Sequence, residues 1–162
     1  MGLHSFCEAI FIPRKQWFVA GSMTGHIKVY NYEMMQEVKR FRAHDPDFID
    51  SLDIHPSEPY VLSAAYYDRT VKLWNWEKGW ECVRTFDTVS YKAKFNPKHA
   101  EYFACATPNG VKIWNIVSPV SDDPTFILEC SGVRHLDYLS RGDDLYLITG
   151  LSENWIVTTS EE

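Results

Sequence analysis

The stretch Val71-Lys72-Leu73-Trp74-Asn75-Trp76 decides the fold class of this chain. Apolar and polar side chains alternate along it and it ends in aromatic residues, which is typical of a β-strand with one buried face. The pattern occurs twice more, as Ile27-Lys28-Val29-Tyr30-Asn31-Tyr32 upstream and as Val111-Lys112-Ile113-Trp114-Asn115-Ile116 downstream. The aromatic residues at the fourth position of these stretches lie 44 and 40 positions apart. A unit recurring at this period indicates a propeller or a solenoid.

A second, chemically independent feature has the same period. Pro13, Pro56 and Pro97 lie in predicted turns that are 43 and 41 positions apart. Around each of them the sequence predicts short strands separated by turn residues, and no segment has the amphipathic length that a helical repeat needs. Four antiparallel strands per unit of this length form the blade of a β-propeller.

We therefore predict an all-β, incomplete β-propeller of about four blades, each with four antiparallel strands. The chain would form one domain over residues 1–162, with units at approximately 6–42, 43–86, 87–129 and 130–162. The first strand of the second unit is predicted over residues 48–54 and that of the third over residues 89–95, and the last unit ends before a fourth strand. The assignment of residues 34–41 to a strand depends on their place in the repeat, because Met, Gln, Glu and Lys favour helix.

Composition excludes several classes of protein. Hydrophobic residues make up 45% of the 162 residues and aromatic residues 15%, which predicts an ordered globular chain. A formal net charge of −6 argues against nucleic acid as the main partner. No apolar run approaches the roughly 18 residues that span a bilayer, and the first residues lack the pattern of a signal peptide.

The reactive side chains do not form a recognisable site. Cys7, Cys82, Cys105 and Cys130 contain no C-x-x-C pair, and the histidines complete no metal-ligand spacing. We expect reduced thiols, no metal and no cofactor. Neither a nucleophile elbow nor a pair of catalytic carboxylates is recognisable, so we predict that the chain is not an enzyme.

The units resemble WD repeats, and most specifically those of the coatomer beta-prime family. Residues 11–17 read Phe-Ile-Pro-Arg-Lys-Gln-Trp, and 55–63 read His-Pro-Ser-Glu-Pro-Tyr-Val-Leu-Ser. Residues 71–80 read Val-Lys-Leu-Trp-Asn-Trp-Glu-Lys-Gly-Trp, and Phe95-Asn96-Pro97-Lys98 with Tyr146-Leu147-Ile148-Thr149-Gly150 extend the match. The resemblance runs in order over nearly the whole chain and corresponds to the second through part of the fifth blade of the family's first propeller.

The resemblance implies a function in vesicle coats. Members of the family belong to the coat of Golgi vesicles, and their first propeller binds dilysine signals on cargo tails. We therefore expect a non-enzymatic coat protein of Golgi–ER transport, cytoplasmic and peripheral at Golgi membranes and coated vesicles. Its partners would be other coatomer subunits and cargo tails, and it would meet the membrane only through the coat.

The resemblance also assigns structural roles to three residues. WD blades are held together by hydrogen bonds among a buried His, Ser and Asp and the strand Trp. His44 is expected to be such a blade histidine, and Trp74 and Trp114 the blade tryptophans. The other units lack the histidine. The Ser-Asp-Asp turn is rewritten as Ser22-Met23-Thr24 and Ala106-Thr107-Pro108 in two of them, and as Ala65-Tyr66-Tyr67-Asp68, with one inserted residue, in the unit of His44. These departures are typical of a diverged, shortened copy.

The cargo site carries over only in part. The family's cargo-reading carboxylate corresponds to Asp47, whose alternative interpretation is a solvated turn residue. Asp50 replaces an arginine of the family site, and the second acidic position falls in the rewritten turn at 66–68. Trp80 and Trp155 remain candidates for interface residues.

Two functional hypotheses stay open, a coat protein of the coatomer type and a generic WD-repeat adaptor. A fragment without coat function is a third possibility.

Overall fold

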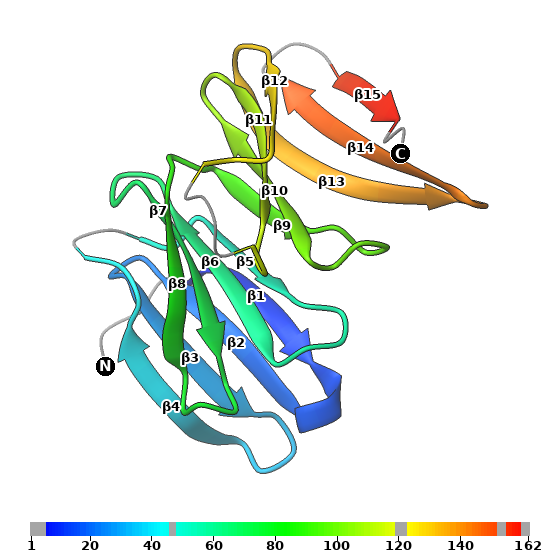
Figure 1. Cartoon of the computed structure of the whole chain (residues 1–162). Helices are drawn as coiled ribbons and strands as arrows, with labels where there is room; N and C mark the ends of the chain where they lie inside the picture. The colour runs from blue at the N-terminus through cyan, green and yellow to red at the C-terminus, as the bar shows by residue number, and fades with distance from the viewer. Residues whose placement is uncertain (1–5, 46–47, 119–122, 152–154, 160–162) are drawn as a thin grey trace.

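A computed structural model describes residues 6–45, 48–118, 123–151 and 155–159. The chain folds into four antiparallel sheets that follow one another along the sequence and are arranged as an arc (Figure 1). This confirms the all-β, incomplete propeller that the repeat predicts. Among the described residues there is no helix of the length and apolarity needed to cross a membrane.

Each of the first two sheets contains four strands in sequence order. The first consists of β1 (Phe6–Ile12), β2 (Trp17–Ser22), β3 (His26–Asn31) and β4 (Gln36–Arg42), with a short 3-10 turn, η1 (Pro13–Lys15), between β1 and β2. The second consists of β5 (Ser51–Ile54), β6 (Tyr60–Ala65), β7 (Thr70–Asn75) and β8 (Glu81–Asp87). The stretch that decides the fold is thus β7 and the residue after it.

The third and fourth sheets continue the arc. The third contains β9 (Lys92–Phe95), β10 (Tyr102–Thr107), β11 (Gly110–Asn115) and β12 (Phe126–Glu129). The fourth contains β13 (Val133–Arg141), β14 (Asp144–Leu151) and β15 (Trp155–Thr159), and has three described strands. The first strands of the sheets lie toward one another, since β5 contacts β1 and β9, and β9 contacts β13.

The core lies between the sheets. Alternation of side chains gives each sheet two apolar faces, and neighbouring faces bury each other. Between the first and second sheets the buried side chains include Ile12, Val19, Ile27, Val29, Leu52, Val61 and Trp74. Between the second and third they include Leu62, Leu73, Phe86, Phe95, Phe103 and Trp114, and between the third and fourth Ala104, Val111, Leu136 and Leu147.

Several strands begin later than the sequence predicts. The second unit was expected to start a strand at Phe48, but β5 begins at Ser51. The reason is that Ile49 contacts the first sheet: its backbone N–H donates to the carbonyl oxygen of Ser22, and its side chain is buried against Gly21. In the third unit the expected strand from Val89 likewise begins only at Lys92.

Trp80 does not lie at a free surface. It is 7% exposed and its ring lies 6.2 Å from that of Trp17 and 5.8 Å from that of Phe41, across the first sheet interface. Of the two tryptophans left open as interface candidates, Trp80 therefore belongs to the core, because the turn after β7 returns its ring there. The side chain of Trp155 lies outside the described residues.

Candidate protein-interaction site

A buried hydrogen-bond network holds the second sheet together around His44. The imidazole is 1% exposed, and its Nε2 lies 2.7 Å from Ser63 Oγ while its Nδ1 lies 2.6 Å from Asp68 Oδ2. Ser63 Oγ also accepts the indole N–H of Trp74 at 2.8 Å, and the Thr70 hydroxyl donates to Asp68 at 3.0 Å. The network joins the segment before β5, both central strands and the turn between them.

The geometry indicates the protonation state of this network. A carboxylate oxygen accepts, so Nδ1 of His44 carries a proton and donates it to Asp68, while Nε2 shares a hydrogen bond with the Ser63 hydroxyl. Burial alone raises the pKa of the Asp68 carboxyl, but hydrogen bonds from His44 and Thr70 and the nearby Lys72 ammonium outweigh it and hold that pKa below its ordinary value. The carboxylate is therefore ionised at neutral pH and fixes the turn in which it lies.

Trp114 occupies the same place in the third sheet without this network. It is 2% exposed, and its indole N–H has no hydrogen-bond partner among the described residues. Cys105 stands opposite Lys112 in the sheet, as Ser63 stands opposite Lys72. Burial raises the pKa of the Cys105 thiol to about 12, so a neutral thiol replaces the serine hydroxyl.

An aromatic row lies where the segments before β5 and β9 meet the β6–β7 turn. We use this name for Phe48, Tyr66, Tyr67 and Tyr91. The rings of Tyr66 and Tyr91 stack with centroids 4.5 Å apart, those of Tyr66 and Tyr67 are 5.1 Å apart, and those of Tyr67 and Phe48 are 6.0 Å apart. Tyr67 is 70% exposed. Contacting tyrosines presented in this way are typical of protein-binding surfaces.

Charged groups border the aromatic row. The guanidinium of Arg134, on β13, lies 5.1 Å from the ring centroid of Tyr91. On the other side Asp50 accepts the backbone N–H of Tyr66 at 2.6 Å. The pKa of Tyr91 is raised, first by its hydrogen bond with Tyr66 and then by burial. The row, together with Arg134, thus connects the second, third and fourth sheets. Asp47, the carboxylate expected to read cargo, lies outside the described residues.

Ion pairs between the first strands of the sheets keep these segments in place. Glu8 on β1 accepts the backbone N–H of Leu52 on β5 at 2.6 Å and pairs with Lys92 on β9. Lys94 lies 3.7 Å from carboxylate oxygens of both Asp53 and Asp137, on β5 and β13. Burial raises the pKa of the Asp53 carboxyl, and the positive charge of Lys94 opposes this increase.

The described residues contain no group of His, Cys, Asp and Glu that could hold a metal ion. Cys82, Cys105 and Cys130 are free thiols. The arrangement offers surfaces for binding.

Sequence reasoning missed two features of the site. It treated Asp68 as part of a rewritten turn, whereas the inserted residue leaves this carboxylate in contact with His44. It also treated Tyr66 and Tyr67 only as lost acidic positions and did not connect them with Phe48 and Tyr91. The signal that could have found the row is that Phe48 and Tyr91 lie near the start of the first predicted strand of a unit, while Tyr66 and Tyr67 lie in the turn after the second strand, which is at the same end of a blade.

Comparisons with known proteins agree with this architecture. The profile of the family described as WD domain, G-beta repeat matches residues 35–75, which include β5, β6 and β7. A solved structure, the β-propeller domain of Myceliophteria thermophila Cps50 (Swd1), superposes with a TM-score of 0.74, covering 92% of this chain and 50% of that one. At 23% identity this likeness shows the fold alone. The chain thus has an incomplete β-propeller fold and contains a stretch that matches the WD-repeat family.

The similar sequences are more specific. Coatomer subunit beta'-2 of Arabidopsis thaliana is 45% identical over 87 residues, which are 50% of this chain and 9% of that protein. Coatomer subunit beta'-2 of Oryza sativa subsp. japonica is 45% identical over 83 residues, and coatomer subunit beta' of Rattus norvegicus is 36% identical over 83 residues. These stretches cover 48% of this chain and 9% of each relative. Over about half of its length the chain is therefore similar to one part of the coatomer beta' subunits.

Proposed function

We propose that this chain is a non-enzymatic vesicle-coat protein of the coatomer beta' type, acting in Golgi–ER protein transport. The observation that carries the proposal is the 45% identity to plant coatomer beta' subunits over 87 residues. Its domain would extend over 1–162, and its place would be the cytoplasmic side of Golgi membranes and coated vesicles, held there through other coatomer subunits.

The aromatic row is the surface proposed to bind a protein partner. Tyrosine buries a large apolar area with little loss of side-chain freedom and adds a hydroxyl that can donate or accept, so exposed tyrosines contribute strongly to binding energy. Asp47, which directly precedes Phe48 in the sequence, is proposed to contribute its carboxylate to cargo binding. An ammonium group of a cargo tail is attracted by carboxylates and by the faces of aromatic rings.

Copurification from cells tests the coat assignment. The tagged chain is expected to capture other coatomer subunits, and Tyr67→Ser is expected to weaken that capture at least tenfold. Phe126→Ser is the matched control, since Phe126 is 55% exposed on β12, outside the aromatic row. Recovery of no coatomer subunit would refute the coat assignment, and equal loss in both variants would refute the role of the aromatic row.

A generic WD-repeat adaptor is the second candidate, and the composition of the site favours it. Asp50 stands where the resembling family has an arginine, and its carboxylate is engaged by the N–H of Tyr66. Titration of the chain with a dilysine tail peptide and with its Lys→Ala counterpart separates the two functions. The coat function predicts that the dilysine peptide binds and that Asp47→Ala weakens it, whereas the adaptor function predicts equal, negligible binding.

A further inference from the structure

The second and third sheets share a framework, which allows position-by-position comparison. Lys72 pairs across the sheet with Ser63, and Lys112 with Cys105. The two lysines therefore occupy the same place on β7 and β11, two residues before the tryptophan of each strand. By the same pairing Asp87 on β8 corresponds to Glu129 on β12, and Thr70 to Gly110.

In the second sheet, the segment that carries His44 fills the space beside Lys72. The Lys72 ammonium donates to the carbonyl oxygen of Ala43 at 2.7 Å and lies 3.5 Å from a carboxylate oxygen of Asp68. Two oxygens from separate segments thus neutralise and solvate this lysine. The pocket that remains there, lined by residues 68–70, 87 and 88, measures about 290 Å³.

The third sheet lacks that segment because its connection is shorter. Residues 43–50 join β4 to β5, which is eight residues, and residues 88–91 join β8 to β9, which is four. The shorter connection contributes no side chain to the pocket of the third sheet, and Gly110 adds none where the second sheet has Thr70. This pocket measures about 600 Å³, within the range of ligand sites.

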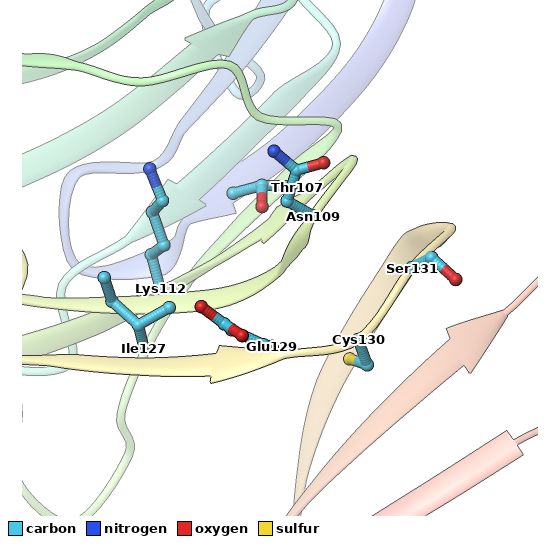
Figure 2. A pocket seen from close by; sticks show the side chains of 7 residues that line it. All are labelled: Thr107, Asn109, Lys112, Ile127, Glu129, Cys130 and Ser131. Carbon is cyan, nitrogen blue, oxygen red and sulfur yellow. The ribbon is translucent and has the colours of Figure 1, made fainter.

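Polar and apolar side chains line the larger pocket. Figure 2 shows them on β10, β11, β12 and the adjoining turns: Thr107, Asn109, Lys112, Ile127, Glu129, Cys130 and Ser131. Within the described part of the chain the Lys112 ammonium has no hydrogen-bond or ion-pair partner, and it lies 6.0 Å from the ring centroid of Trp114. The lysine therefore lacks both oxygens that its counterpart contacts.

We propose that this pocket binds an extended, acidic peptide segment of a partner protein. A carboxylate of the peptide pairs with Lys112, as Asp68 does with Lys72, and a backbone carbonyl takes the place of that of Ala43. The side chains of Asn109 and Ser131 supply neutral hydrogen-bond donors, and Glu129 accepts a backbone N–H of the peptide. The second sheet supplies the template, since there the same surface is covered by a stretch of the chain itself.

A peptide selection tests this site independently of the proposed coat function. A phage-displayed random heptapeptide library is selected on the wild-type chain and depleted on Lys112→Met. Enriched sequences are then made as fluorescein-labelled peptides and titrated by fluorescence polarisation. We expect Asp or Glu in every enriched peptide, at least tenfold weaker binding to Lys112→Met, and binding to Lys112→Arg within threefold of wild type.

Two further variants keep the test decisive. Ser131→Trp fills the pocket from an exposed loop position and is expected to abolish binding even if Lys112→Met does not fold. Lys78→Met, at an exposed turn, is the matched control and leaves binding unchanged. The proposal would be overturned if no peptides are enriched, if the enriched peptides lack acidic residues, or if Ser131→Trp binds as well as wild type. Loss of binding in Tyr67→Ser would also overturn it.

Discussion

Replacement of His44 by alanine should strongly destabilise the fold. The imidazole is buried and joins Ser63 to Asp68, with heavy-atom distances of 2.7 and 2.6 Å. Its removal leaves a buried hydroxyl and a largely buried carboxylate without that partner, and each such loss costs about 1–3 kcal/mol. Asp68 keeps its hydrogen bond from the Thr70 hydroxyl, and its side chain is 17% exposed. We therefore expect the free energy of unfolding to fall by about 3 kcal/mol, which lies in the lower part of the combined range.

Urea unfolding followed by tryptophan fluorescence measures this cost, and a thermal scan should show a fall in Tm of roughly 6–12 °C for a chain of this size. His135→Ala, an exposed histidine on β13, is the control and should change the free energy of unfolding by less than about 0.5 kcal/mol.

A double-mutant cycle with Ser63→Ala should give a coupling of at least ~1 kcal/mol, because the two side chains share a hydrogen bond. The reasoning is refuted if His44→Ala costs less than about 1 kcal/mol, or if the two substitutions are additive.

Three further predictions concern single positions. Gly110→Ala should lower the free energy of unfolding by more than ~2 kcal/mol, because φ is +136° and the added Cβ would lie 2.0 Å from a carbonyl oxygen of β12. Gly79→Ala, where φ is +70° and the space is open, should lower it by about 1 kcal/mol. Cys105→Ser should raise Tm by about 2–4 °C by giving the Trp114 indole an acceptor; an unchanged or lower Tm contradicts this. Folding lowers the pKa of Asp68, so its contribution to stability is complete above about pH 4 and is lost as the pH falls further. Acid titration of wild type and Asp68→Asn will compare how the stability of the two proteins changes with pH.

The sequence predicts those features that depend on interactions between residues close together in the chain. Alternation along 71–76 and its two relatives depends on neighbours within one strand, and Pro13, Pro56 and Pro97 act on their own turns. Such local signals predicted four sheets of short antiparallel strands. They placed the start of β5 too early, because Ile49 alternates like a strand residue while its contacts come from another sheet.

The candidate site depends on longer separations. Asp68 lies 24 positions from His44, and Tyr91 lies 25 positions from Tyr66, so neither pairing is visible in a periodic pattern. The family resemblance pointed to Asp47 and treated the turn before β7 as degraded. The folded chain instead places Asp68 in the His44 network and the two tyrosines of that turn in an exposed row.

The sequence by itself determined the strands, the turns and their period, because these arise from side-chain alternation and backbone preferences within a few residues. Only the tertiary structure decided that the second sheet keeps a closed hydrogen-bond network and that the third replaces it with a pocket beside Lys112. The physical reason is that this difference comes from the length of a connection and from the packing of one sheet on the next. A connection shortened from eight residues to four preserves the strand pattern on both sides while it changes what covers the lysine between them.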